Sequence, residues 1–476
     1  MVSIETDQIF ANGIFAKTGL PLPLSTNLSK DLKASLRRED QSKSKLMGKR
    51  GLRVDLNPAE LAEAGWGIVF PANNMKADEI EDALSPLIQW RASEAKDLFK
   101  IFKGKTGWRV GDTASAWLAR QGSQGARMDV VNPKAGVPYY LMIVGSPEEL
   151  PMSFQYSLDI FWGVGRLHFS TVEEYKRYAK DVVDYESAAK PPQTQKLAAV
   201  FATKHSRDRA TEMFTERVAK PLVCGDDEND PLGWKQRFKV DRMLGREATK
   251  AGLTELLRGE RTGGLPALLI SGTHGMAFEL GDSRQSACQG ALVCQDWKQL
   301  GTIDESAWFS AADIPAEASL KGLVYFMFAC YGGGWEKVDT FRTGLGGVAN
   351  QIAPTASVSR LSQAMLAHPK GGALAIIAHV DRAWSYAFTT ENGGTQATGM
   401  RNVLTAIMMG TRLGHAMDQF NVRWAAIATE LSDAIRNKLP DAEIARMWIA
   451  RDDARNYSIF GDPAVRLRVE TMIDGI

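Results

Sequence analysis

The fold of this chain is decided at LLISGTHGMAFELGD, residues 268–282, where an apolar run of strand length ends in Thr-His-Gly. A second stretch, residues 323–334, repeats the pattern as LVYFMFACYGGG, with Cys330 in the place of His274. Continuous apolar runs of this kind indicate strands buried on both faces, as in a parallel sheet covered by helices. In such sheets, ligands bind beyond the carboxyl ends of the strands. We therefore expect His274 and Cys330 to lie at one edge of a parallel sheet.

Similar apolar runs occur on both sides of these stretches and alternate with amphipathic segments. They predict a first series of strands at 66–71 and 139–145, and a second at 197–203, 266–272, 323–329 and 372–380. Helical spacing predicts helices at 77–95, 207–220, 246–258, 355–367, 398–413, 422–438 and 441–451. This alternation is typical of α/β proteins. The predicted fold is two α/β layers, with mostly parallel sheets flanked by helices.

A proline-rich stretch at residues 188–196, AAKPPQTQK, separates the two series, because Pro-Pro ends a helix and favours extended chain. We place a first α/β subdomain at residues 51–190 and a second, catalytic α/β subdomain at residues 191–476. Residues 1–50 form an N-terminal arm. The Ser-, Lys- and Arg-rich composition of residues 25–50 predicts that this arm is partly mobile.

Composition argues against several classes of function. The 476 residues include 57 basic and 56 acidic side chains, and a net charge of +1 favours neither nucleic acid nor an anionic membrane as a partner. The four cysteines have neither a disulfide-framework nor a zinc-site spacing, so we expect no metal and no cofactor. No apolar run approaches the roughly 20 residues of a membrane span. We expect a cytoplasmic protein with reduced thiols.

His274 and Cys330 are residue types that acyl-transfer chemistry uses. A cysteine thiolate attacks an acyl carbon, and a nearby imidazole takes the thiol proton or protonates the leaving amine. Glycines follow both residues, and glycine lets a backbone N–H approach an oxyanion without a Cβ in the way. The amides of Gly275 and Cys330 are our candidates for that oxyanion hole. Singly, each residue also fits a structural role, as a strand-end histidine or a buried thiol, and only the paired pattern favours catalysis.

Other candidates fit structural roles better. Cys288 and Cys294 flank QGALV, a predicted strand at residues 289–293, and are expected to pack rather than react. His379 ends the strand at 372–380 and is expected to serve structure. The chain contains neither the Gly-x-Ser-x-Gly elbow of serine hydrolases nor a Gly-x-x-x-x-Gly-Lys-Ser/Thr phosphate loop.

The ordered pair of strand ends, His-Gly and then Ala-Cys, resembles the caspase-fold, or clan CD, cysteine peptidases: caspases, gingipains, separases and bacterial CHAT proteases. Three further stretches are similar to the gingipain and CHAT-like bacterial branch. They are VPYYLMIVGSPEELP at 137–151, the Val-Gly-Arg strand end and following helix within 159–186, and YSIFGDPAVRLR at 457–468. The resemblance covers roughly residues 130–470.

This resemblance implies a cysteine endopeptidase that makes limited, regulatory cuts in protein or peptide substrates through a His274–Cys330 dyad. It also implies a regulatory or activating partner and, from bacterial relatives, a role in defence or programmed cell death. Secretion and calcium dependence are not carried over, because the sequence before residue 51 lacks a gingipain-like signal and pro-segment.

Substrate preference is a separate question. In relatives that cleave after Arg or Lys, an acidic side chain binds the substrate's cation, and Asp159 and Asp381 are the candidates here. A pocket for Asp would instead use arginines, with Arg382 and Arg284 as the options. Two other functions stay open: a pseudoenzyme or peptide-binding module of the same fold, and a thiol acyltransferase that uses the same dyad.

Overall fold

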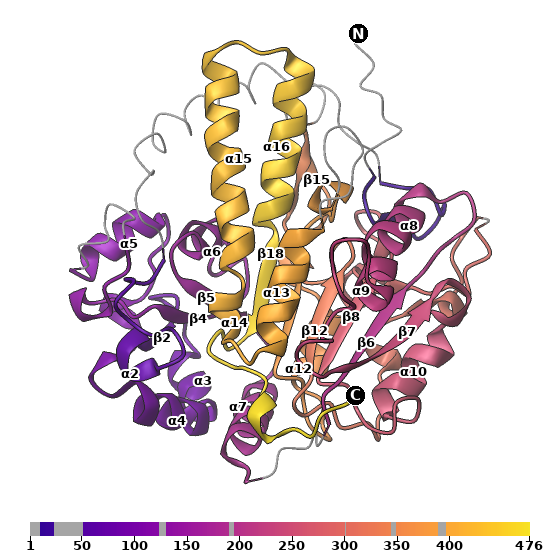
Figure 1. Ribbon diagram of the computed structural model, residues 1–476. Helices are drawn as coiled ribbons and strands as arrows, with labels where there is room; N and C mark the ends of the chain where they lie inside the picture. Colours follow the sequence, from indigo (N-terminus) through magenta and orange to yellow (C-terminus); the bar gives the residue numbers. More distant parts are fainter. Residues whose placement is uncertain are drawn as a thin grey trace.

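The computed structural model describes residues 10–22, 51–122, 130–189, 195–299, 301–343, 349–388 and 397–476. Its centre is a ten-stranded sheet in the order β3-β2-β4-β5-β18-β17-β12-β8-β6-β7. Helices flank this mostly parallel sheet, so the predicted α/β class is confirmed (Figure 1). The predicted mobile stretch at 25–50 lies outside the described residues, as do residues 190–194 of the predicted linker.

Six of the ten strands lie at the predicted apolar runs, and the other four fall outside those runs. The strands of the first series are β2 (Trp66–Val69), β3 (Phe99–Phe102), β4 (Tyr140–Val144) and β5 (Gly163–Leu167). Those of the second are β6 (Leu197–Ala202), β7 (Lys239–Leu244), β8 (Leu268–Gly272), β12 (Val324–Phe328) and β17 (Ala375–His379). The tenth strand is β18 (Tyr457–Gly461). Most of these strands are buried along their whole length, as their apolar composition predicts.

Both series belong to one sheet, because β18 lies between them. β18 runs parallel to β5 and antiparallel to β17. The strands of the first series therefore run opposite to those of the second, and their carboxyl ends lie at opposite edges of the sheet. Only the carboxyl ends of the second series share an edge with His274 and Cys330. One hydrophobic core extends through both subdomains.

Helices flank the sheet, and each of the seven ranges where amphipathic spacing predicted a helix contains one, with further helices outside those ranges. Over the first series these are α2 (Leu61–Ala64), α3 (Ala77–Ala83), α4 (Ser85–Ala95), α5 (Ala114–Arg120), α6 (Met152–Asp159) and α7 (Val172–Ser187). Over the second series they are α8 (Arg209–Phe214), α9 (Lys220–Cys224), α10 (Lys250–Arg258), α12 (Arg360–Leu366), α13 (Thr398–Met408) and α14 (Leu413–Ala416). Two long helices near the C-terminus, α15 (Asp418–Arg436) and α16 (Asp441–Arg455), stand side by side and extend beyond the sheet (Figure 1). None of the helices within the described ranges is long and apolar enough to cross a membrane.

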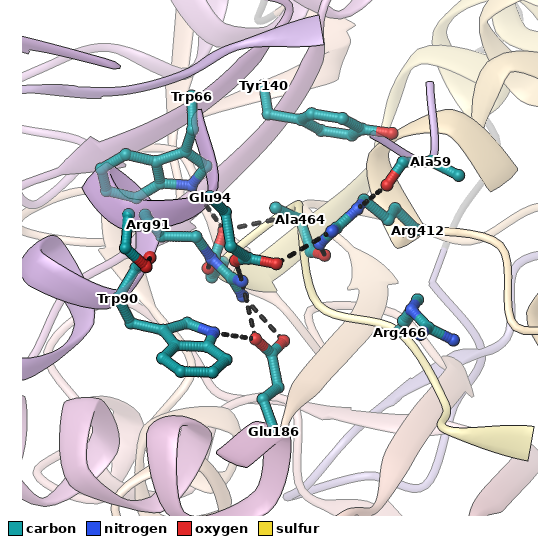
Figure 2. Close-up of polar contacts among 12 residues, drawn as sticks. Ala59, Trp66, Trp90, Arg91, Glu94, Tyr140, Glu186, Arg412, Ala464 and Arg466 are labelled. Carbon is teal, nitrogen blue, oxygen red and sulfur yellow. Dashed lines mark hydrogen bonds and ion pairs between the residues drawn. The ribbon is translucent and has the colours of Figure 1, made fainter. Parts of the chain in front are cut away.

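A buried arginine joins the first subdomain to the segment after β18 (Figure 2). The side chain of Arg91 is fully buried, and its Nε donates to Asp462 at 2.6 Å. Its other nitrogens donate to Glu186 at 2.6 and 2.8 Å. The indole of Trp66 donates to the second carboxylate oxygen of Asp462 at 2.9 Å, and that of Trp90 donates to Glu186 at 2.7 Å. The Gly-Asp-Pro-Ala segment that contributed to the resemblance thus has a structural role.

A smaller sheet lies beside the carboxyl ends of β8 and β12, in the order β1-β9-β10-β11. Its strands are β1 (Gly13–Phe15), β9 (Gly275–Ala277), β10 (Leu292–Val293) and β11 (Trp308–Phe309). β1 belongs to the predicted N-terminal arm and pairs in parallel with β9, in the register Gly13 to Gly275. Figure 1 shows this segment in indigo near α8. The arm therefore contributes a strand to the neighbourhood of His274.

Candidate active site

The structure brings His274 and Cys330 to corresponding positions at one edge of the main sheet. β8 and β12 are adjacent and parallel, and Gly272 pairs with Phe328 at their last register position. His274 and Cys330 each follow two residues later. Both side chains are buried. The expectation that the two strands end at the same edge is met, and the catalytic roles of the two residues stay a prediction.

Asp208 holds the imidazole of His274. The distance between His274 Nε2 and Asp208 Oδ2 is 2.6 Å. A carboxylate accepts hydrogen bonds, so Nε2 carries the proton of the ring and Nδ1 is left as the basic nitrogen. Within the described residues, Nδ1 has no hydrogen-bond partner. This arrangement leaves Nδ1 available to accept a proton from a thiol.

The carboxylate of Asp208 is itself fixed. It directly precedes α8, and the hydroxyl of Thr211 donates to Asp208 Oδ2 at 2.7 Å. Burial raises the pKa of Asp208, but the neighbouring His274 charge and hydrogen bond outweigh burial and lower the pKa to about 2. Asp208 is therefore ionised at neutral pH and can stabilise an imidazolium at His274.

Both predicted oxyanion-hole amides donate to a single oxygen atom. The N–H of Gly275 and the N–H of Cys330 each lie 2.9 Å from the carbonyl oxygen of Asn12. Two converging backbone donors beside a nucleophile are the arrangement that stabilises a developing oxyanion in acyl transfer. The structure thus brings together the two amides that sequence reasoning selected, with an oxygen of the chain's own N-terminal segment between them.

Close packing against the backbone of Cys330 is a second reason for glycine at residue 275, in addition to the approach of its N–H to an oxyanion. A Cβ at this position would lie 1.8 Å from the carbonyl oxygen of Cys330 and 3.0 Å from its nitrogen. Real Cβ atoms do not approach backbone atoms that closely. A side chain at residue 275 would therefore push the two loops apart and separate the two amides.

The thiol of Cys330 is covered by the N-terminal segment. Cys330 is 0% exposed, and its Sγ accepts a hydrogen bond from the Ala383 N–H at 3.3 Å. A Cβ built on Gly13 would lie 2.7 Å from Cys330 Sγ, so the backbone of Gly13 lies directly against the sulfur. Burial raises the pKa of the Cys330 thiol well above its ordinary value. With the segment in place, the thiol is neutral and closed to solvent.

Of the two predicted pocket acids, the structure places Asp381 near Cys330 and Asp159 away from it. Asp159 ends α6, before β5, and two strands separate β5 from β12, a distance of roughly 14 Å. The backbone of Asp381 accepts a hydrogen bond from the N–H of Tyr331, next to Cys330. Its carboxylate accepts from the Thr340 hydroxyl at 2.5 Å, and burial raises its pKa to about 7. Asp381 is thus built into the wall beside Cys330.

The two predicted arginines are both engaged with acids. Arg382 is buried and forms an ion pair with Asp339. Arg284 donates to Asp282 at 2.8 Å and lies over the ring of Phe278. One cavity of about 280 Å³ is lined by residues that include Phe15, Leu22, Phe278, Asp339 and Arg382.

The remaining candidates take structural positions. Cys294 is buried in the core, whereas Cys288 is partly exposed at the end of α11 (Gln285–Cys288). His379 is fully buried, and burial lowers its pKa to about 3. Across the ranges that the structure covers, no group of three or more His, Cys, Asp or Glu side chains is arranged to hold a metal ion.

Sequence reasoning missed two residues of this site, Asp208 and Asn12. Asp208 follows the predicted strand at 197–203 and lies at the start of the predicted helix at 207–220, so it stands near the carboxyl end of a strand. That position was the available signal, but the sequence does not say that β6 lies beside β8. Asn12 lies in a short segment far from both motifs, and the sequence gives no comparable signal for it.

Comparison with known proteins supports the clan CD interpretation. The model of peptidase family C25 matches residues 280–468, a range that contains Cys330 and the Gly-Asp-Pro-Ala segment. No curated protein matches the chain. Among solved structures, the chain is similar to the Arg-specific cysteine proteinase gingipain R, with 12% identity over 86% of this chain and 79% of that chain, and a TM-score of 0.47.

Two further structures are similar at comparable levels. The complex of the RgpB pro- and mature domains of Porphyromonas gingivalis has 11% identity over 85% of this chain and 80% of that one, with a TM-score of 0.42. A structure described only as a protease has 13% identity, covers 84% and 78%, and has a TM-score of 0.47. The family match agrees with the resemblance drawn from the sequence: residues 280–468 of this chain are similar to peptidase family C25.

Proposed function

We propose that this protein is a cysteine endopeptidase that makes limited, regulatory cuts in protein or peptide substrates, with Cys330 as nucleophile and His274 as its base and acid. The observation that carries the proposal is the convergence of the Gly275 and Cys330 amides on one carbonyl oxygen, at 2.9 Å each. That oxygen occupies the position which the carbonyl oxygen of a scissile peptide bond requires.

Each residue has a defined task in this mechanism. His274 Nδ1 takes the thiol proton, Sγ of Cys330 attacks the substrate carbonyl carbon, and the two amides stabilise the oxyanion. His274 then gives the proton to the leaving amine, and water hydrolyses the thioester. Asp208 extends the predicted dyad, because it fixes the ring tautomer and stabilises the imidazolium. Asp208 acts through His274 and is a positioning residue.

The regulatory character of the cuts is inferred from the covered thiol. A nucleophile at 0% exposure cannot receive a substrate until the covering segment moves, so activity depends on a prior event. A regulatory or activating partner is one way to supply it. We also propose that the protein acts in the cytoplasm, with support from its four free cysteines. A role in bacterial defence or programmed cell death stays a prediction from the resemblance.

A peptide library cleaved by the wild-type chain, and by Cys330→Ala and Cys294→Ala variants, tests this function. Cys294 is a matched control, because it is also buried, and burial likewise raises the pKa of its thiol. We expect Cys330→Ala to abolish cleavage and Cys294→Ala to keep it. Once the covering segment has moved, labelling by a peptide carrying a thiol-reactive group should occur at Cys330 alone. Cleavage that survives Cys330→Ala, or equal labelling of all four cysteines, would favour the binding module.

A further inference from the structure

We propose that the chain cleaves its own backbone between Asn12 and Gly13, and that residues 10–13 are bound in the active site as an intramolecular substrate. This inference rests on the proposed function, since it uses the same nucleophile, and it names a substrate of that site. The scissile bond follows an asparagine and precedes a glycine.

Residues 10–12 bind as an extended peptide would. The N–H of Asn12 donates to the carbonyl oxygen of Ala383, and the N–H of Ser385 donates to the carbonyl oxygen of Phe10, both at 2.9 Å. Ala11 forms an antiparallel bridge with Trp384. These contacts add a short strand to residues 383–385, the mode by which extended peptides are recognised through main-chain hydrogen bonds. The direction and register of the segment at the site are thereby fixed.

This register places one particular carbonyl group in the oxyanion hole. The oxygen that accepts from both Gly275 and Cys330 belongs to Asn12, and the next residue, Gly13, lies against Cys330 Sγ. Of all the peptide bonds in the segment, only the bond between Asn12 and Gly13 therefore has its carbonyl oxygen between two donors and its amide beside the thiol. A segment that only covered the site would not require a carbonyl oxygen between the two amides and the following residue beside the thiol.

Glycine at residue 13 is what permits the approach. A Cβ at this position would lie 2.7 Å from both Cβ and Sγ of Cys330, and 2.6 Å from a methyl group of Leu22. Beyond Gly13, the chain continues as β1 alongside β9. The residues after the scissile bond are thus held in place by the pairing of β1 with β9.

The side chain of Asn12 identifies the pocket before the scissile bond. Asn12 is 0% exposed, and its Nδ2 donates to the carbonyl oxygen of Thr273 at 3.4 Å. Its Oδ1 is buried and has no partner in the described part of the chain. A closed site of this size, with a backbone acceptor at its end, suits a short side chain with an amide. We infer that Asn is the preferred residue before the cut.

His274 and Cys330 supply the proton transfers and the nucleophile that the reaction needs. His274 Nδ1 takes the proton of Cys330, and Sγ forms a bond to the carbonyl carbon of Asn12. The bond from that carbon to the nitrogen of Gly13 breaks, and His274 protonates this nitrogen as it leaves. Water then hydrolyses the thioester, which frees the carboxylate of Asn12 and regenerates the thiol. Residues 1–12 depart, Gly13 becomes the new N-terminus, and the part of the cleft that residues 10–12 filled becomes open.

Mass spectrometry of the intact full-length chain over time tests this inference. In reducing buffer, the wild type should lose residues 1–12 and begin at Gly13, at a rate independent of protein concentration, because the reaction is intramolecular. Cys330→Ala should stay uncut. Asn12→Gln, which adds one methylene to a closed pocket, should slow the cut about 10–200-fold. Lys17→Ala, on the same segment at an exposed side chain, should be cut at the wild-type rate.

Two controls separate the possible failures. The sequence holds a second Asn-Gly pair at 392–393, which reports any reaction of such bonds that needs no enzyme. A Gly13→Val variant cannot seat the segment against Cys330, so its cleft is open without a cut and it should cleave the peptide library. An uncut wild type together with active Gly13→Val overturns self-cleavage and leaves the proposed function standing. If Gly13→Val is also inactive and resists labelling at Cys330, both ideas fail. A cut at any bond other than 12–13 overturns the inference.

Discussion

Replacing Arg91 by methionine should destabilise the whole chain, because Arg91 is the buried cation that holds two acids from distant parts of the sequence. Glu186 lies in the last turn of α7 and Asp462 follows β18, and both lie within 2.8 Å of the guanidinium. Methionine fills a similar volume without charge. The variant would leave two buried carboxylates with no cation between them.

The size of the effect follows from burial. The side chains of Arg91 and Asp462 are fully buried and that of Glu186 is 9% exposed, and breaking a buried ion pair by removing one partner costs about 3–5 kcal/mol. An unfolding entropy of about 2.1 cal/mol/K per residue gives about 1 kcal/mol/K for 476 residues. We therefore expect a Tm lower by about 3–5 °C at pH 7.

Calorimetry measures this difference in Tm on the wild type, Arg91→Met and a surface control, Arg53→Met. Arg53 pairs with Asp55 at the surface, so its loss should lower the Tm by less than about 1 °C. Burial raises the pKa of Glu186, but Arg91 outweighs burial and lowers it. The stabilisation is therefore complete at neutral pH and is lost as pH falls below about 4, so the Tm difference should narrow in acid. A shift under 1 °C, or one that does not change with pH, would refute this account.

Three further predictions concern the active site. Asp208→Asn should lower kcat/KM on peptides about 100-fold while an Asp55→Asn control keeps the wild-type value, because only Asp208 fixes the ring of His274; unchanged kinetics would remove Asp208 from the mechanism. Gly275→Ala should lose cleavage, because its Cβ would displace the oxyanion amides; a wild-type rate would exclude this hole. Before the chain is cut, peptide mapping should show fast alkylation of the exposed Cys224 and slow alkylation of Cys330. Equal rates at the two residues would contradict the burial of the Cys330 thiol.

Local pattern was sufficient to predict β6, β8, β12 and β17, but not β7, in the half of the sheet that contains His274 and Cys330. The apolar runs at 266–272 and 323–329 form β8 and β12, and their apolar composition predicted burial on both faces, as in a parallel sheet. The register observed in the structure places His274 and Cys330 at corresponding positions. The strand predictions depend on residues that lie within a few positions of one another, where periodicity and glycine placement carry strong signals.

Long-range pairing was beyond reach for a physical reason. Backbone N–H and C=O groups are the same in every strand, so they do not specify which strands pair. The sequence therefore does not show that β18 joins the two series or that the strand direction reverses there. For the same reason, the two-layer prediction did not foresee a single sheet. Asp208 lies 66 residues before His274, and Asn12 lies 262 residues before it, and each reaches the site through tertiary packing alone.

The central place of β18 sets the order in which this protein can be assembled during synthesis. β18 is the last of the ten strands to leave the ribosome, yet it occupies an interior position between β5 and β17. A nascent chain that stops before residue 457 has two half-sheets with open edges and no bridge between them, a state that is prone to mispairing. The complete ten-stranded sheet can therefore form only after residue 461 has been synthesised.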